Sequence, residues 1–191
     1  MSAQQQAGHK TRRAGPAPDP HAVVLRAAAL LLDYPQTDHA EADARLIDAA
    51  VAELPNRPAR RQLRAFLEWW LKLSPRDREA SYVETFDLSP HHSLHLSSWH
   101  GDDAAERSAC LLSLRAAYCA ADVEVSSAEL PDYLPLLLEF AAALPDAWSL
   151  LAAETEALEG LRQSLAAAKS PFELVLSAVL ATLPSAAKDR P

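Results

Sequence analysis

Alanine and leucine dominate the sequence, and this bias limits the possible folds more than any other feature. The 191 residues include 39 Ala and 31 Leu, whereas Val and Ile together number only 9. Helices favour Ala and Leu and strands favour β-branched residues, so a large sheet is disfavoured. Because 49% of the residues are apolar, a chain of this length can bury a substantial core. We therefore expect an all-α protein that forms a single-domain helical bundle.

Residues that start and stop helices divide the chain into about eight expected helices. They span residues 21–33, 38–53, 58–73, 75–86, 102–121, 133–144, 147–168 and 171–183. The segments 88–101 and 123–131 lack helical periodicity and are expected to be ordered loops. The helical domain is expected to cover residues 20–184, between a disordered tail at 1–19 and a frayed tail at 185–191.

An apolar stripe on the expected helix 102–121 predicts the position of that helix. The stripe consists of Ala105, Ala109, Leu112, Ala116 and Cys119, and Leu111, Leu114 and Tyr118 lie beside it. A helix with so broad an apolar surface is expected at the centre of a bundle. Cys110 and Cys119 point to opposite sides of this helix, about 13 Å apart along its axis, so they are not expected to form a disulfide. A chain without a disulfide is typical of the reducing cytosol.

The charge of the chain is concentrated in its central part. The formal net charge is −8, but residues 1–19 carry +2 and residues 188–191 carry +1, so residues 20–187 carry −11. Such an acidic body disfavours nonspecific binding to nucleic acid and suits a basic partner, although the same charge can serve solubility alone. The apolar runs are far shorter than the roughly 20 residues needed to cross a membrane. We expect a cytoplasmic protein without stable membrane insertion.

Four histidines, His91, His92, His95 and His100, are the candidates for metal binding within one loop. Imidazoles bind zinc, but the loop lacks the i, i+4 spacing with a glutamate that is typical of a ligand helix, so a polar loop also explains them. Pairs of carboxylates occur at expected helix starts, where capping accounts for them. No nucleophile is paired with a base in a known motif. We expect no catalytic residue, no metal and no cofactor, and a metal-dependent hydrolase that uses the histidines is the alternative.

Two segments combine aromatic, acidic and proline residues at junctions between loops and helices. The first comprises Tyr82, Phe86 and Asp87, followed by Ser93, Leu94 and Leu96. The second is the run Glu-Leu-Pro-Asp-Tyr-Leu-Pro at residues 129–135, followed by Glu139 and Phe140. Between them, Gly101, Asp102 and Arg107 open the helix that carries Tyr118.

These segments resemble the NarJ-type molybdoenzyme chaperones, which belong to the TorD/DmsD group of redox-enzyme maturation proteins. The resemblance extends over residues 22–183, and His95 departs from it because many relatives carry an aromatic residue there. It implies a TorD-like helical chaperone without catalytic activity, whose client is the apo catalytic subunit of a respiratory nitrate reductase. The chaperone would bind the N-terminal segment of the client and hold it competent for insertion of the molybdenum cofactor and an iron–sulfur cluster before membrane docking. Cofactor-insertion proteins would be further partners, and the chain would be a monomer or a weak homodimer.

A basic, partly apolar client segment predicts a receptor with aromatic or apolar anchors and an acidic rim. The expected anchors are Tyr82, Phe86, Leu94, Tyr118, Tyr133 and Phe140, and the expected rim consists of Glu84, Asp87, Asp102, Glu129 and Asp132. Arg107 and Pro131 complete the expected peptide-binding set. The alternatives without peptide contact are an ion pair of Arg107 with Asp103 and a role of Pro131 in fixing the shape of its loop. Core positions are the alternative for Phe86, Tyr118 and Phe140, and helix capping is the alternative for Asp132. A chaperone of a different twin-arginine-type molybdoenzyme and a generic helical scaffold are the alternatives for the function.

Overall fold

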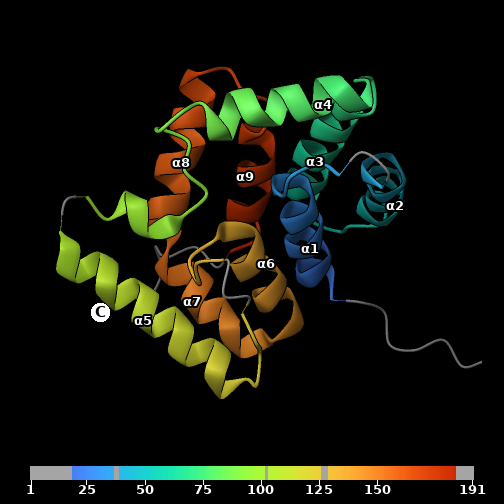
Figure 1. Cartoon of the computed structure of the whole chain (residues 1–191). Coiled ribbons are helices and arrows are strands. Elements are labelled where there is room, and N and C mark those ends of the chain that lie inside the picture. The colour runs from blue at the N-terminus through green and yellow to red at the C-terminus, as the bar shows by residue number, and fades with distance from the viewer. Residues whose placement is uncertain (1–18, 37–38, 102, 126–128, 184–191) are drawn as a thin grey trace, which may run out of the picture.

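Nine α-helices run through the residues that the computed structural model describes, which are 19–36, 39–101, 103–125 and 129–183 (Figure 1). In chain order they are α1 (Pro20–Leu32), α2 (Ala40–Ala52), α3 (Arg57–Trp70), α4 (Pro75–Tyr82), α5 (Ala104–Ala120), α6 (Leu134–Ala143), α7 (Trp148–Ala153), α8 (Thr155–Ala167) and α9 (Glu173–Leu180). A π-helical turn η1 (Val83–Asp87) and two 3₁₀ turns, η2 (Leu96–Trp99) and η3 (Pro145–Ala147), lie between them. The prediction of an all-α bundle is confirmed.

The helix count differs from the expected eight because the segment 147–168 forms two helices. The break falls at Glu154, whose backbone adopts φ −89° and ψ 14° between α7 and α8. The carboxylate of Glu154 contacts His100 and Cys110, two residues from other parts of the fold. Tertiary contacts of one buried side chain therefore accompany a break that the sequence pattern did not indicate.

Several helix starts follow from local sequence. The side chain of Asn56 accepts a hydrogen bond from the backbone N–H of Ala59 at the start of α3. Ser74 likewise accepts from the N–H of Asp77 in α4, and Asp103 accepts from the N–H of Ala105 in α5. Such side chains satisfy backbone donors that have no partner within the helix. Asn56, Ser74 and Asp103 are therefore the N-cap residues of α3, α4 and α5.

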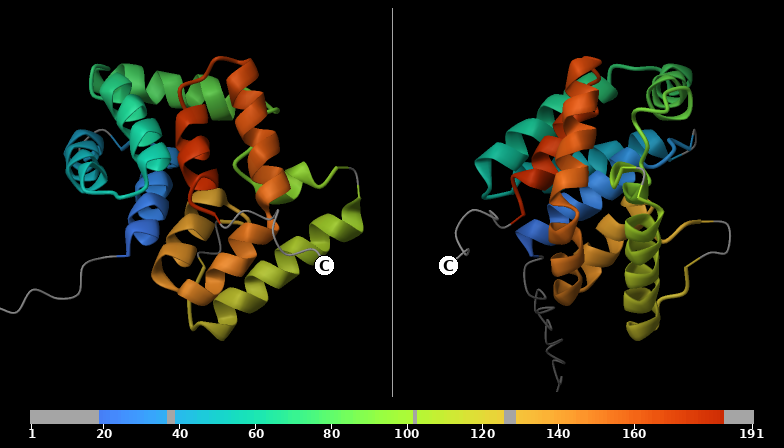
Figure 2. Two further views of the ribbon diagram at one scale, coloured as in Figure 1. Left: turned by 180° about the vertical axis from the view of Figure 1, so that it is seen from behind. Right: turned by 90° about the vertical axis from the view of Figure 1, so that its left-hand side faces the viewer.

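The centre of the bundle is formed by α1, α6 and α9. Seven residues of α1 are buried, and α1 packs against α2, α6 and α9. Helix α9 also contacts α3 and α8 and lies between these two helices (Figures 1 and 2). Burial of these Ala-, Leu- and Val-rich helices provides the main apolar core.

An aromatic cluster joins α3, α4 and the start of α9. Phe172 lies at its centre, with its ring centroid 5.2 Å from that of Phe66 and 4.8 Å from that of Phe86. Tyr82 packs against Phe86 with a centroid distance of 5.0 Å. The side chains of Tyr82, which precedes the π-helical turn η1, and of Phe86, which lies within it, therefore contribute to core packing.

The expectation that the helix at 102–121 lies at the centre of the bundle is wrong. Helix α5 lies along the outside of the bundle, and only Leu114 and Tyr118 among its 17 residues are buried (Figures 1 and 2). All five residues of the predicted apolar stripe are exposed, and the side chain of Leu112 is 67% exposed. The helix turns Leu114 and Tyr118 inward, and these side chains bury more apolar area than the alanines of the stripe would.

No helix within the described ranges is long and apolar enough to span a lipid bilayer. Residues 1–18 and 184–191, which hold the tails expected from the sequence, lie outside the described residues. Cys110 and Cys119 are both free cysteines, as the spacing along the helix predicted. Cys110 is partly buried against the bundle, whereas Cys119 is exposed.

Candidate functional site

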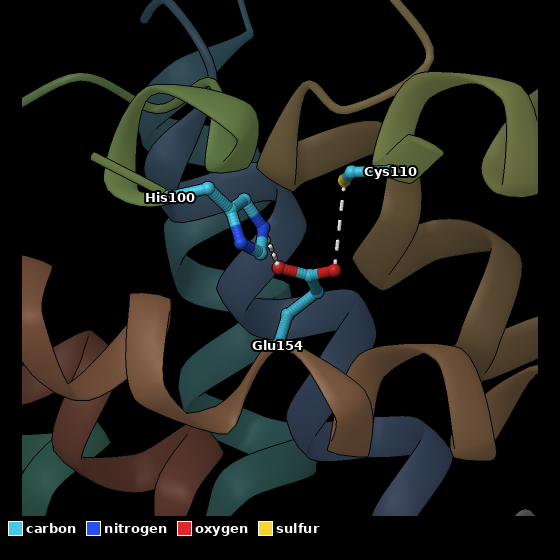
Figure 3. Close-up of side chains that lie close together, drawn as sticks. All are labelled: His100, Cys110 and Glu154. Carbon is cyan, nitrogen blue, oxygen red and sulfur yellow. Dashed lines mark hydrogen bonds and ion pairs between the residues drawn. The ribbon is translucent and has the colours of Figure 1, made fainter. Parts of the chain in front are cut away.

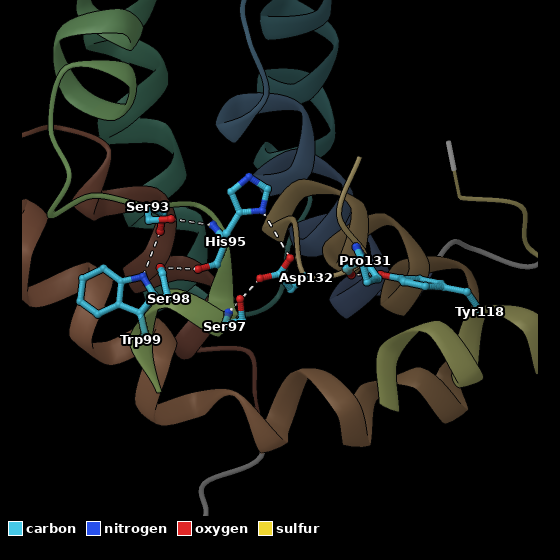
Figure 4. Close-up of polar contacts among 8 residues, drawn as sticks. All are labelled: Ser93, His95, Ser97, Ser98, Trp99, Tyr118, Pro131 and Asp132. Carbon is cyan, nitrogen blue, oxygen red and sulfur yellow. Dashed lines mark hydrogen bonds and ion pairs between the residues drawn. The ribbon is translucent and has the colours of Figure 1, made fainter. Parts of the chain in front are cut away.

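The two segments that the sequence singled out pair with each other. The backbone N–H of Leu96 donates to the carbonyl oxygen of Asp132 at 3.1 Å, and the N–H of Leu134 donates to that of Leu94 at 2.8 Å. Between these bonds, His95 and Tyr133 form an isolated antiparallel β-bridge. Figure 4 shows the loop around His95 facing Asp132 across this junction. Segments almost forty residues apart in the chain thus form one unit at the start of α6.

Asp132 is the buried centre of this junction, and its side chain is 0% exposed. Its carboxylate accepts a hydrogen bond from the backbone N–H of Ser97 at 3.0 Å and lies 3.4 Å from Nδ1 of His95 (Figure 4). Burial alone would raise the pKa of Asp132, but the hydrogen bonds from His95 and Ser97 outweigh it and lower that pKa below its ordinary value. The same contact with Asp132 raises the pKa of His95 against an opposing effect of burial.

Two expectations for Asp132 are therefore wrong. It does not cap α6, because the N-cap residue is Tyr133 and no side-chain hydrogen bond caps this helix. It does not form an exposed rim, because its carboxylate is directed at the loop 95–97. A buried carboxylate of this kind stabilises the loop arrangement instead of presenting a charge to solvent.

A chain of phenol and carboxylate groups extends from the junction to the end of α1. The hydroxyl of Tyr133 donates to Oδ1 of Asp33 at 3.1 Å, and the hydroxyls of Tyr82 and Tyr133 lie 3.4 Å apart. Since the Tyr133 proton is directed to Asp33, Tyr82 is the donor to Tyr133. Burial raises the pKa of Tyr82 to about 12 and also raises that of Tyr133, so both phenols are neutral hydrogen-bonding groups.

Three adjoining hollows lie along this side of the molecule, and the charged groups in their linings are mainly carboxylates. The first, of about 110 Å³, lies between α1 and α6 and includes Leu30, Asp33, Glu129 and Tyr133 in its lining. The second, of about 190 Å³, shares Leu30 and Asp33 with it, and the third, of about 510 Å³, shares Glu129. Their carboxylates, which we call the acidic surface, belong to Asp33, Asp43, Asp122, Glu124, Glu129 and Glu139.

Most of the expected anchors are buried in the core. The side chains of Tyr82, Leu94, Tyr118 and Phe140 are at most 7% exposed. Tyr118 donates its hydroxyl hydrogen to the carbonyl oxygen of Pro131 at 3.1 Å (Figure 4), and its ring lies 4.5 Å from that of Phe140. The alternative interpretation of Tyr118 and Phe140 as core residues is thereby confirmed. Phe86 is partly buried within the aromatic cluster, and Tyr133 is partly exposed and lines the first hollow.

The remaining members of the expected set are distributed over different surfaces. Glu129 lines the first and the third hollow, and the buried Pro131 also lines the third hollow. Glu84, Asp87 and Arg107 are exposed but line none of these three hollows. Asp103, the expected partner of Arg107, directs its carboxylate to backbone N–H groups of α5. Asp102 lies outside the described residues.

The loop histidines do not assemble in one place within the described structure. Nδ1 of His92 contacts the carbonyl oxygen of Thr85, His95 faces Asp132, and His100 contacts Glu154. His91 is exposed. The hydrolase alternative that relied on these four residues as a group therefore has no common site to use.

The expected peptide-binding set did not include five carboxylates of the acidic surface, which are those of Asp33, Asp43, Asp122, Glu124 and Glu139. Their carboxylates come from four separate segments, so no local motif joins them. The one available signal was the strongly acidic charge of residues 20–187, which predicted an acidic surface but not its position. A basic hollow of about 900 Å³ on α3, lined by Arg57, Arg60, Arg61, Arg64 and Lys72 among others, was also not anticipated.

The paired segments lie in a region that matches a known protein family. Residues 52–173 match the family model described as "Nitrate reductase delta subunit". The matched region contains α3 to α8 and both segments of the junction. The chain therefore belongs to the nitrate reductase delta subunit family, and the resemblance to NarJ-type chaperones is confirmed.

Curated relatives carry related names. The chain is 36% identical over 123 residues to the probable nitrate reductase molybdenum cofactor assembly chaperone NarJ of Bacillus subtilis, covering 63% of this chain and 65% of that protein. It is 33% identical over 134 residues to the chaperone NarJ of Escherichia coli K12, covering 69% of this chain and 53% of that protein. It is also 33% identical over 165 residues to the nitrate reductase-like protein NarX of Mycobacterium tuberculosis H37Rv, covering 84% of this chain but only 24% of that protein. The chain thus spans between a quarter and two thirds of these relatives.

Proposed function

We propose that this protein is a chaperone for assembly of a respiratory nitrate reductase. In this proposal it binds the N-terminal segment of the apo catalytic subunit in the cytoplasm. It holds the subunit competent for insertion of the molybdenum cofactor and an iron–sulfur cluster before the subunit docks at the membrane. Family membership and the names of the NarJ relatives support the assembly role.

The acidic surface supports a basic client segment. Six carboxylates line the three adjoining hollows, and Arg115 is the only Lys or Arg among the described residues that line them. A surface of one charge attracts an oppositely charged segment and increases the rate of encounter, most strongly at low salt. The basic hollow on α3 would repel the same segment, so the charge distribution favours one side of the molecule.

Exposed apolar side chains within the same hollows also support binding of the client segment. Leu30, Tyr34 and Leu130 are between 45% and 50% exposed, and each lines one or two of the three hollows. Carboxylates around exposed apolar groups match an amphipathic helix that has apolar residues on one face and basic residues on the other. This combination of apolar and acidic groups is the observation that most directly supports peptide recognition.

The proposal is tested by calorimetric titration of the full chain with a synthetic peptide that has the sequence of the client N-terminal segment. Reversing two charges of the acidic surface, Glu129→Lys and Glu139→Lys, should weaken binding by about three- to tenfold, because both carboxylates are exposed and partly screened. Glu156→Lys is the matched control, since Glu156 is an exposed carboxylate on α8 away from the three hollows.

Salt dependence provides the second readout of the same experiment. Affinity of the unmodified protein should fall as salt is raised, and this fall should be smaller for the double variant because it has fewer attractive charges. Equal affinity of the double variant and the control would contradict binding at the acidic surface. Equal affinity for an N-terminal peptide of a different molybdoenzyme would contradict nitrate reductase as the specific client.

A further inference from the structure

Three potential metal ligands from separate parts of the chain meet outside the acidic surface. They are Nε2 of His100, which follows η2, Sγ of Cys110 in α5, and the carboxylate of Glu154 at the break between α7 and α8. One ligand atom of each lies within 4.8 Å of the others. Figure 3 shows the Glu154 carboxylate between the other two side chains, with Oε2 2.9 Å from His100 Nε2 and Oε1 3.5 Å from Cys110 Sγ.

Glu154 is a buried carboxylate without a Lys or Arg partner in the described part of the chain. Its side chain is 10% exposed, and its side-chain contacts are with His100 and Cys110. Neither an imidazole nor a thiol carries a fixed positive charge. Taking a carboxylate out of water is unfavourable unless a cation or sufficient hydrogen bonds compensate it. A bound cation would provide that compensation.

The three donors together favour a particular class of cation. Thiolate, imidazole and carboxylate are the ligands of zinc and similar divalent transition metals, whereas magnesium and calcium prefer oxygen alone. Zinc lies about 2.0 to 2.3 Å from such ligands, so the ligands of a tetrahedral ion are roughly 3.4 to 3.7 Å apart. The present separations require shifts of about 1 Å or less to reach this arrangement.

We propose that His100, Cys110 and Glu154 form a binding site for zinc or a similar divalent transition metal ion. The thiol of Cys110 releases its proton to solvent when the sulfur coordinates the metal, and Nε2 of His100 coordinates in the neutral tautomer that carries its proton on Nδ1. Bonds to the ion then replace both hydrogen bonds to Glu154. Three protein ligands leave a fourth position for water or an external ligand.

The site would attach α5 to the rest of the bundle. Only two residues of α5 are buried, and its main neighbour among the helices and turns is η2. The three ligands connect α5 to the end of η2 and to the break between α7 and α8, so an ion would add a direct link between these elements. A metal bound only to the folded state stabilises that state.

The experiment uses the full chain after removal of metals with a chelator. Cobalt(II) is added, because its bond to a thiolate gives a charge-transfer absorption band, and zinc content is measured in parallel after desalting. We expect one retained ion per chain, a cobalt–thiolate band, and a higher melting temperature with zinc. Cys110→Ala and His100→Ala should each lower the affinity by at least about tenfold, and Cys110→Ala should remove the band.

The chain contains matched controls for both ligands. Cys119→Ala removes an exposed thiol from the same helix, and His91→Ala removes an exposed imidazole from the same loop, and both variants should retain the metal. Cys110→Ala is expected to keep its helix because alanine has the highest helix propensity, which circular dichroism checks, and His100→Ala gives an independent test outside α5. Failure to retain an ion, retention by Cys110→Ala, or loss in Cys119→Ala would each overturn the proposal.

Discussion

Helices α5 and α6 follow each other in the chain but lie in different environments. Both are rich in alanine and leucine, and they are joined by the loop that leads to Asp132. Seven of the ten residues of α6 are buried, but only two of the 17 residues of α5 are. In Figure 1, α6 lies beside α1, whereas α5 lies along the outside of the bundle. The alanine and leucine content predicts that both segments are helical, and the apolar stripe on residues 105–119 did not show which one is central.

The difference arises from the partners that each helix meets. Helix α6 packs along α1 and begins at the junction that pairs Leu134 with Leu94. Helix α5 has one inward face, on which Leu114 and Tyr118 reach the bundle. A side chain that stays in solvent gives up the hydrophobic stabilisation of burial, and this loss is smaller for alanine than for leucine. The alanine-rich face of α5 can therefore remain in solvent at small cost in free energy.

Truncation of one leucine in each helix is expected to have the largest effect and tests this comparison directly. Leu138→Ala in α6 removes a fully buried side chain and should lower the free energy of unfolding by about 2 to 5 kcal/mol. Leu112→Ala in α5 removes a side chain that is 67% exposed and should change it by no more than about 0.5 kcal/mol. Urea denaturation measures both, and equal losses would mean that the exposed face of α5 is covered in solution.

Substitution of the aspartates that precede the two helices should change the free energy of unfolding by a smaller amount. Asp132→Ala removes the acceptor of the Ser97 N–H and the partner of His95, and should cost about 1 to 3 kcal/mol of unfolding free energy. Asp103→Ala removes only the cap of α5 and should cost about 1 kcal/mol. A larger loss for Asp103→Ala, measured by the same denaturation, would contradict the central role of the Asp132 junction.

The smallest expected effect is a pH dependence at the start of α6. The contact with Asp132 raises the pKa of folded His95, so its contribution to stability is complete below the ordinary histidine pKa and disappears as pH rises through the raised value. Asp132, whose pKa is lowered, remains ionised throughout that range. The difference in melting temperature between the unmodified protein and His95→Gln should therefore shrink from pH 6 to pH 8. A constant difference would show that His95 acts without its charge.

Sequence reasoning located the two segments of the junction but not the function of every residue in them. The resemblance singled out Leu94, Asp132 and Tyr133 together, and the structure pairs the segments that contain them. It did not reveal that Asp132 is buried, because an aspartate before a helix is usually a cap. It also could not place Asp33 near Tyr133, since the two residues lie 100 positions apart and no local pattern links them.

The amino-acid sequence by itself determined that the chain is helical, approximately where its helices lie, and which family it belongs to. These properties depend on helix propensity, capping residues and local motifs, which act over a few neighbouring residues. Only the tertiary structure decided that α5 lies outside, that Asp132 is buried, and that His100, Cys110 and Glu154 meet. Those outcomes depend on which distant surfaces pack together, because burial and long-range contacts are properties of the whole bundle.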